Sequence, residues 1–167
     1  KQLKQELITE LCAVLAFSAI TNNDKVGVIF FSNQIEKFIP PKKGRKHILM
    51  IIRELIEFQP QNNTTNLKEA LRYFTQVIKK RCTAFLISDF LDEGFDDELK
   101  ITNRKHDLVA IQVYDEREME IPNVGIVQLV DAETGENFWF NTSSKSNRVN
   151  YKANALRKND EINSLLK

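Results

Sequence analysis

The sequence has little of several features that would point to a particular chemistry. It contains five glycines in 167 residues, which leaves little material for a loop that cradles phosphate. The patterns Gly-x-Ser-x-Gly, Gly-x-x-x-x-Gly-Lys-Ser/Thr, Gly-x-Gly-x-x-Gly and His-Glu-x-x-His do not occur in it. Its net charge is only +1, from 24 basic and 23 acidic side chains. A balanced charge gives no overall attraction to nucleic acid or anionic lipid. These absences predict a protein that is not an enzyme and has no nucleic-acid partner.

Cysteines and long apolar runs are also scarce. The two cysteines, Cys12 and Cys82, have no metal-ligand spacing and lie in apolar segments, as buried free thiols do. We therefore expect a reducing compartment, the cytoplasm. No apolar run reaches the roughly 18–20 residues that a membrane span needs, and no signal-peptide pattern opens the sequence. Because Lys1 is not an initiator methionine, we expect a fragment of a longer polypeptide.

The sequence does contain alternating helix and strand patterns, at a length that suits one domain over residues 1–167. Apolar periodicity predicts helices at 1–22, 48–58, 67–80, 96–106 and 143–167, and strands at 25–32, 35–39, 84–87, 107–114, 123–131 and 137–140. Such alternation is typical of an α/β protein with three layers and mainly parallel strands. The last two strands are expected to form a C-terminal β-hairpin around a loop at 132–136, followed by the final helix.

The run Ala84-Phe85-Leu86-Ile87 is the centre of the predicted sheet. It is short, apolar and unbroken, as are strands buried on both faces. Asp89 follows it, at the carboxyl end of the strand, where ligands bind in open α/β sheets. This carboxylate is therefore interpreted either as a helix cap or as part of a site.

The first predicted helix is apolar almost all round from residue 11 to residue 19, so we expect burial on more than one side. In a right-handed βαβ unit such a helix follows the strand that it covers. The sequence therefore predicts a sheet that lacks its first, central strand. Another chain could supply that strand, or the open edges could pair with each other in self-association.

Three segments carry a resemblance to a known family. They are ELCAVLAFSAITNNDKVGVIFFS (residues 10–32), IPPKKGRKH (39–47) and FLISDFLDEG (85–94). In this order they resemble the bacterial domain-of-unknown-function family 58, over most of the chain. That family is similar to von Willebrand factor A domains, which have a Rossmann-like sheet and often a metal-ion-dependent adhesion site. Its members are commonly encoded beside MoxR-type AAA+ ATPases and are thought to act with them in chaperone-like assembly. The resemblance implies a non-catalytic interaction module whose partner is such an ATPase or its client.

The resemblance also implies a metal site built from three segments. An Asp-x-Ser-x-Ser loop follows the first strand, a threonine comes from a middle loop, and an aspartate follows the fourth strand. Thr65 and Asp89 match the last two, whereas the first loop has no counterpart in this chain. Asn66 stands where relatives often have aspartate. Two oxygen ligands are too few for tight Mg²⁺ binding. We therefore expect Mg²⁺ in the full-length protein rather than in this chain.

Several other residues could form a site, but each also has a simpler structural explanation. The basic segment Lys42–His47 could bind phosphate, nucleic acid or an acidic partner, or could be a solvated loop. Asp89 could serve a metal-dependent hydrolase. The acidic residues between 89 and 98 do not fit a calcium loop and are better explained as helix-start charges. His47 and His106 are expected at the surface, and Trp139 is expected to pack within the hairpin unless exposure makes it an interface anchor.

Overall fold

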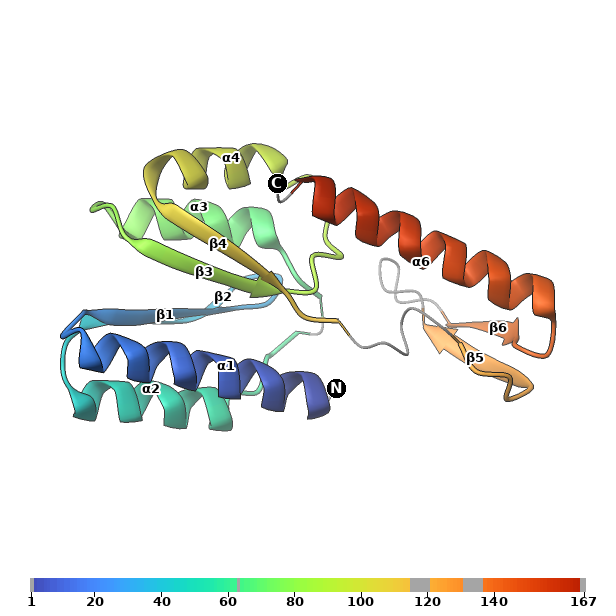
Figure 1. Cartoon of the computed structure of the whole chain (residues 1–167), viewed down its shortest axis with the longest axis horizontal. Helices are drawn as coiled ribbons and strands as arrows, with labels where there is room; N and C mark the ends of the chain where they lie inside the picture. Colours follow the sequence, from blue (N-terminus) through green and yellow to red (C-terminus); the bar gives the residue numbers. More distant parts are fainter. Residues whose placement is uncertain (1, 63, 115–120, 131–136, 166–167) are drawn as a thin grey trace. The chain divides into compact units, whose positions relative to one another are not determined.

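The computed structural model of the chain describes residues 2–62, 64–114, 121–130 and 137–165 (Figure 1). Within these ranges there are five helices and six strands. In chain order they are α1 (Gln2–Thr21), β1 (Val26–Phe31), β2 (Ile35–Lys42), α2 (Arg45–Glu57), α3 (Leu67–Val77), β3 (Thr83–Ser88), α4 (Asp96–Lys105), β4 (Asp107–Gln112), β5 (Ile126–Val130), β6 (Asn137–Asn141) and α6 (Lys145–Leu165). None of these helices is long and apolar enough to cross a lipid bilayer.

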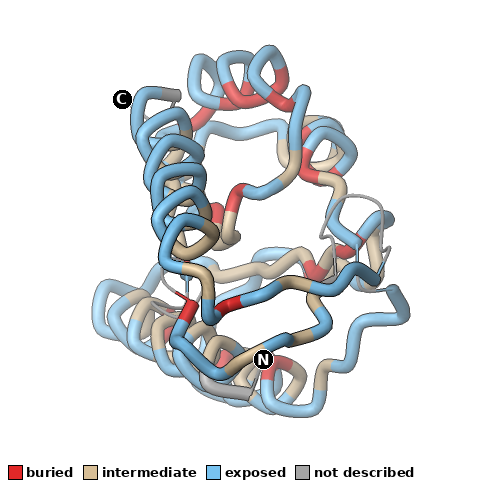
Figure 2. The backbone as a smooth tube through the Cα atoms, turned by 90° about the vertical axis from the view of Figure 1, so that its right-hand side faces the viewer, coloured by how far each residue is buried: buried red, intermediate tan, exposed pale blue. Residues whose placement is uncertain are grey.

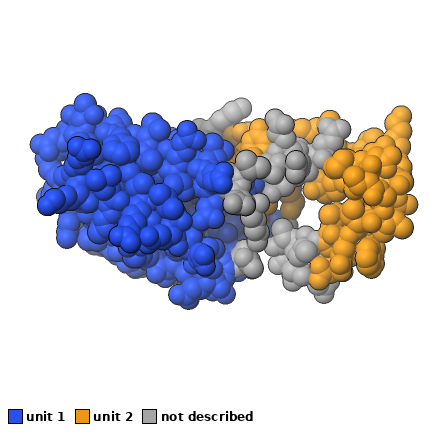
Figure 3. All heavy atoms as spheres, turned by 90° about the horizontal axis from the view of Figure 1, so that it is seen from below, with its two compact units in different colours: residues 1–87, 92–111 blue, residues 88–91, 112–167 orange. Residues whose placement is uncertain are grey.

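The chain divides into two compact units, coloured separately in Figure 3. Unit 1 comprises Lys1–Ile87 and Asp92–Ile111, and unit 2 comprises Ser88–Leu91 and Gln112–Lys167. The strands form three sheets of two strands each, β1 with β2, β3 with β4, and β5 with β6. The predicted α/β class is therefore confirmed. The expected single sheet of mainly parallel strands is not confirmed, since the strands within the described ranges pair only two by two.

The first sheet of unit 1 is an antiparallel hairpin of the two strands predicted at 25–32 and 35–39, with Val28 opposite Ile39 and Ile29 opposite Phe38. Phe30 and Ile39 form a buried cluster with two side chains of α2, Ile51 and Leu55. The second strand was predicted to end at residue 39, before Pro40 and Pro41, but β2 continues through both prolines to Lys42. An outer strand can tolerate prolines because an N–H that faces away from the ladder has no bond to lose.

The second sheet pairs β3 with β4 in parallel. Asp107 donates its N–H to the Cys82 carbonyl and Val113 donates to the Ser88 carbonyl, each at 2.9 Å, so both strands advance in the same direction. Leu86 is 8% exposed, whereas Phe85, which points to the other face, is 44% exposed. The prediction that this strand is buried on both faces is thus wrong for the described chain, because only one face is covered.

Helix α1 is less buried than its apolar sequence predicts. Among residues 4–21 of this helix only Ala16 is buried, while Leu7, Val14 and Phe17 are exposed by 52%, 61% and 45%. Figure 2 shows that most residues of the helices are exposed or intermediate, with buried residues in short stretches. The expectation of burial on more than one side is therefore not met, because α1 covers the sheet with one stripe and its remaining apolar side chains meet no layer.

Helix α3 is shared by both sheets of unit 1. It contacts β1 and β2, and the ring of Tyr73 lies edge-on to Phe38 of β2 with 5.9 Å between the ring centroids. Further along the same helix, the Phe74 ring lies 4.7 Å from the ring of His106, the residue before β4. The helix α3 also packs against α4.

Unit 2 contains the predicted C-terminal hairpin and helix. β5 and β6 pair antiparallel, with Val127 opposite Phe140. The predicted loop at 132–136 lies outside the described residues. The Phe140 ring lies 6.0 Å from the ring of Tyr151, which anchors α6 on one face of the hairpin. Thr142, which directly follows β6, is completely buried, and its hydroxyl accepts from Val124 N at 3.0 Å and donates to Gly125 O at 2.6 Å.

Candidate functional site

The loop before α3 carries the first residue predicted to bind metal. Thr65 is exposed, and the next residue, Asn66, is the N-cap of α3. The Asn66 side-chain oxygen accepts from Glu69 N at 2.9 Å, which satisfies one of the free N–H groups at the helix start. Asn66 also donates its own N–H to the Ser32 carbonyl at 2.9 Å, just beyond β1. The asparagine that departs from the family pattern therefore has a clear structural role here.

Asp92 is a structural carboxylate whose contact with α3 the sequence did not predict. Its Oδ2 accepts from the Leu67 N–H at 2.7 Å, and its Oδ1 accepts from the Glu93 N–H at 2.9 Å. A carboxylate at a helix N-terminus is stabilised by the free N–H groups and the helix dipole. Asp92 therefore caps α3 from the loop after β3. No sequence pattern links two residues 25 positions apart, so local reasoning could not find this contact.

Asp89, the second predicted metal ligand, lies in the Ser88–Leu91 segment of unit 2 and is half-buried. Its Oδ1 accepts from Leu91 N at 3.4 Å, and its carbonyl oxygen accepts from Gln112 Nε2 at 3.5 Å. The next residue, Phe90, is 2% exposed and has φ of 57°. Such a φ is strained for a bulky side chain, and strain of this kind is concentrated at functional loops.

Thr65 belongs to unit 1 and Asp89 to unit 2, so the structure describes the two predicted ligands separately. A hydroxyl and a carboxylate are oxygen donors of the type that Mg²⁺ prefers, but two of them do not complete a coordination shell. Across the described ranges, no group of three or more His, Cys, Asp or Glu side chains is arranged to hold a metal ion. The donor types fit the implied metal, and their number falls short.

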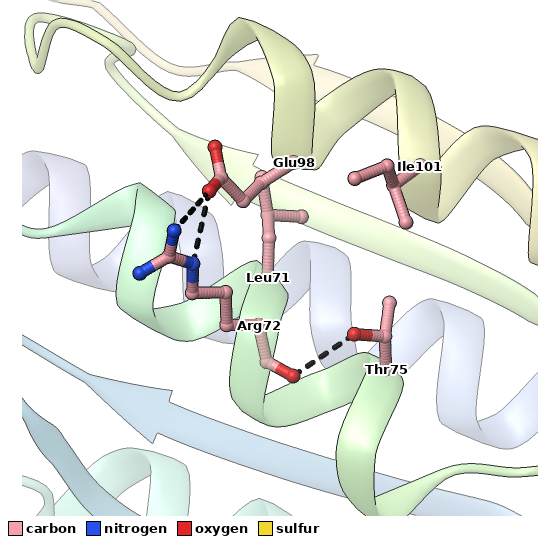
Figure 4. Close-up of a pocket in the computed structure, with 5 residues that line it drawn as sticks. All are labelled: Leu71, Arg72, Thr75, Glu98 and Ile101. Atoms are coloured by element: carbon pink, nitrogen blue, oxygen red, sulfur yellow. Dashed lines mark hydrogen bonds and ion pairs between the residues drawn. The ribbon is translucent and has the colours of Figure 1, made fainter.

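A shallow pocket between α3 and α4 is lined by Leu71, Arg72, Thr75, Glu98 and Ile101 (Figure 4). Glu98 is 9% exposed, and its Oε1 accepts from Arg72 Nε at 2.9 Å and pairs with Arg72 Nη2 at 2.8 Å. Lys68 Nζ lies 4.0 Å from the same oxygen. Since the carboxylate is already matched by two cations, the arrangement holds the two helices together. Glu98 also shares the first turn of α4 with Asp96 and Asp97, as expected of helix-start charges.

His106 is buried, which overturns the expectation of a surface position. It is 1% exposed, its Nδ1 lies 3.5 Å from Cys82 Sγ, and its Nε2 is buried without a hydrogen-bond partner. Burial, followed by the charges of Lys105 and Arg81, lowers the pKa of His106. Burial and then the charge of Asp107 raise the pKa of Cys82. The pair is therefore a neutral imidazole beside a neutral thiol, which does not favour nucleophilic chemistry.

The other histidine is half-buried rather than on the surface, since His47 Nε2 lies 2.9 Å from the Val26 carbonyl oxygen. The basic segment around it is not one loop. Lys42 ends β2, Gly44 is the N-cap of α2 with φ of 105°, and α2 begins at Arg45, three residues earlier than predicted. Positive charges in a first helical turn are disfavoured by the dipole, so these side chains are best explained as solvated.

Trp139 is 72% exposed, so it does not pack within the hairpin. It lies opposite Gln128 in the pairing of β5 with β6, and side chains of adjacent residues point to the other face. Ile126, two positions before Gln128, is also exposed, at 67%. An exposed tryptophan beside an exposed isoleucine is typical of a contact surface.

Comparison with known proteins gives matches of undetermined function. The family model described as "Protein of unknown function DUF58" matches residues 1–161. The chain is 27% identical over 135 residues to uncharacterized protein Mb1516 of Mycobacterium bovis and to uncharacterized protein Rv1480 of Mycobacterium tuberculosis. Each of these matches covers 79% of this chain and 43% of the relative. Uncharacterized protein MAV169 of Mycobacterium avium is 31% identical over 100 residues, 58% of this chain and 59% of that protein. The chain thus spans less than half of the first two relatives. No solved structure matches it.

Proposed function

Because the chain belongs to the family described as "Protein of unknown function DUF58", we propose that it is a non-catalytic protein-interaction module of the von Willebrand factor A type. The partner is a MoxR-type AAA+ ATPase or its client, in chaperone-like assembly. The observation that carries this proposal is the loop at the carboxyl end of β3. There Asp89 precedes Phe90, which has a left-handed backbone and a buried side chain. A loop anchored by a buried side chain loses less conformational entropy on binding, which suits it to present a carboxylate to a partner.

The proposal extends to a metal ion in the full-length protein. Thr65 and Asp89 would be among the ligands of a Mg²⁺ ion, which supplies a positive charge that an acidic group of a partner can bind. In the chain itself, Thr65 lies in the loop that precedes α3, and Asp89 lies in the loop that follows β3. The remaining ligands would come from outside this chain.

The test of recognition is a binding assay with the MoxR-type ATPase encoded nearest the gene of this protein. Asp89→Ala and Asp89→Asn are compared with Asp97→Ala, an exposed carboxylate in the first turn of α4. We expect at least about a tenfold loss of affinity, or roughly 1.4 kcal/mol, for both Asp89 variants and none for the control. Equal binding by all four proteins, with circular dichroism unchanged, would remove Asp89 from the recognition site.

The test of the metal is a calorimetric titration with Mg²⁺ and with Mn²⁺, on this chain and on the full-length protein. Binding by the full-length protein that is lost in Asp89→Ala supports an adhesion-type site. Absence of binding in both would leave Asp89 as a structural residue of the loop, which accepts from Leu91 N. A screen for phosphatase and nuclease activity with either metal added then tests the non-catalytic part of the proposal, which any metal-dependent turnover would contradict.

A further inference from the structure

The pocket between α3 and α4 is small and has apolar walls. Its cavity of about 160 Å³ is lined by Leu71, which is 2% exposed, and by Ile101, which is 46% exposed. Figure 4 shows the pair of Arg72 and Glu98 on one side of this cavity, Thr75 and Ile101 on the other, and Leu71 between them. Small-molecule sites usually measure about 300–1,000 Å³, so a cavity of this size suits one side chain of a larger partner.

Two cations face one carboxylate at this pocket. Glu98 Oε1 accepts from Arg72 Nε at 2.9 Å, and Arg72 Nη2 lies 2.8 Å from the same oxygen. Lys68 Nζ lies 4.0 Å from that oxygen, which is beyond the length of a hydrogen bond. Among the residues that the structure describes, the Lys68 ammonium has no other partner. One positive charge therefore remains unmatched, together with the hydrogen-bond donors that carry it.

The two cations face solvent, whereas the carboxylate does not. The side chains of Lys68 and Arg72 are 46% and 53% exposed, and that of Glu98 is 11% exposed. Two further exposed charges on α4, Asp97 and Lys105, lie one helical turn on either side of position 101 and are opposite in sign. A partner that approaches this surface therefore meets a net positive charge beside the apolar cavity.

The charge and the apolar walls together select the chemistry of an occupant. A free phosphate, or the backbone of a nucleic acid, would meet the cations but leave the apolar walls of the cavity in water. A purely apolar segment would fill the cavity, but it would also take Lys68 and Arg72 out of water without a counter-charge, which is costly. A carboxylate next to an apolar side chain matches both parts of this surface, and acidic protein segments combine the two.

We propose that the pocket between α3 and α4 binds an acidic segment of a partner protein, in which a leucine, isoleucine or methionine lies next to a glutamate or aspartate. The apolar side chain enters the cavity between Leu71 and Ile101, and the carboxylate accepts hydrogen bonds from Lys68 Nζ. Charge complementarity favours this occupant, because the surface holds two cations against one carboxylate. This second contact surface lies in unit 1 and is independent of the Asp89 loop on which the proposed function depends.

The test is a titration of the whole isotope-labelled chain with the peptide acetyl-Gly-Glu-Leu-Glu-Gly-amide, followed by amide NMR spectra. We expect the amide signals of α3 and α4 around the pocket to shift, with a dissociation constant on the order of 1 mM, and the signals of β5 and β6 to stay in place.

Three variants locate the binding. Lys68→Gln removes one exposed ion pair, so the affinity for the peptide should fall about threefold. Ile101→Ala removes apolar surface from the cavity, so the affinity should fall about fivefold. Both side chains are 46% exposed, so both variants should fold. Lys100→Gln makes the same change of charge on the opposite side of α4, two positions after Glu98, and should bind as tightly as the unchanged chain.

Spectra that do not change at about 10 mM peptide would overturn the proposal. Equal affinities for Lys68→Gln, Ile101→Ala and Lys100→Gln would also overturn it, since the peptide would then bind elsewhere. The same peptide with alanine in place of leucine should bind about fivefold more weakly. If it binds equally well, or if inorganic tripolyphosphate displaces the original peptide at the same concentration, the surface binds negative charge of any kind and the assignment to a protein segment is wrong. Asp89→Ala should leave the peptide titration unchanged, so failure of this binding is distinguishable from failure of the proposed recognition through Asp89.

Discussion

The cap that Asp92 provides to α3 gives the sharpest prediction for stability. Its carboxylate accepts from Leu67 N at 2.7 Å, and the Leu67 side chain is completely buried. A hydrogen bond to a charged group contributes about 1.5–3 kcal/mol, and loss of an N-terminal cap costs about 0.5–2 kcal/mol. We expect Asp92→Ala to lower the free energy of unfolding by about 2 kcal/mol, within the overlap of these ranges. Asp92→Asn keeps an acceptor oxygen and loses the charge, so it should cost about 0.5–1 kcal/mol through the helix dipole.

The assay is urea denaturation followed by far-UV circular dichroism, because the perturbed helix α3 contributes to the helical signal, whereas the only tryptophan lies in unit 2. Glu93→Ala is the matched control, since Glu93 is an exposed carboxylate in the same loop and its removal should change stability by less than about 0.5 kcal/mol. The reasoning is refuted if Asp92→Ala is as stable as Glu93→Ala. It is also refuted if Asp92→Asn and Asp92→Ala lower the free energy of unfolding by the same amount, because the acceptor oxygen that asparagine keeps would then contribute nothing.

Three further predictions concern single contacts. Thr142→Val should destabilise unit 2 by about 1–3 kcal/mol because it removes both hydrogen bonds of a completely buried residue's hydroxyl, each worth about 0.5–1.5 kcal/mol. Thr142→Ser, which keeps the hydroxyl, should cost less in the same denaturation experiment. Burial lowers the pKa of His106, so the unfolded chain binds its proton first. The free energy of unfolding should therefore fall as pH drops below about 6.5, until the folded histidine is also protonated. In His106→Leu the free energy of unfolding should fall less steeply over the same pH range. Gly27→Ala should cost about 1–3 kcal/mol, because an added Cβ would lie 2.8 Å from the backbone oxygen of Ile39; an unchanged melting temperature would contradict this clash.

The sequence predicted those features that depend on neighbouring residues. Apolar patterns located the strands of the β1–β2 and β5–β6 hairpins and a helix beginning at residue 67, where α3 begins. Each of these features follows from the periodicity of side chains along a strand or a helix.

Features that depend on distant residues were missed. The burial of His106 follows from Phe74, which belongs to another helix, and the cap by Asp92 joins residues 25 positions apart. Local pattern also overestimated burial: α1 and β3 are apolar on all sides, but the described residues cover each of them on one side only. Periodicity records which surfaces a sequence can bury, whereas the covering element has to be supplied by the rest of the fold.

The exposed Trp139 has a consequence for spectroscopy. It is the only tryptophan of the chain and it belongs to unit 2. Intrinsic fluorescence excited at the red edge of the tryptophan band therefore reports on the hairpin and its surroundings, and unit 1 contributes no emission of this kind. Circular dichroism, by contrast, sums the helices of both units. If fluorescence and ellipticity give the same unfolding midpoint, the two units unfold cooperatively, and separate midpoints would show that each unit melts on its own.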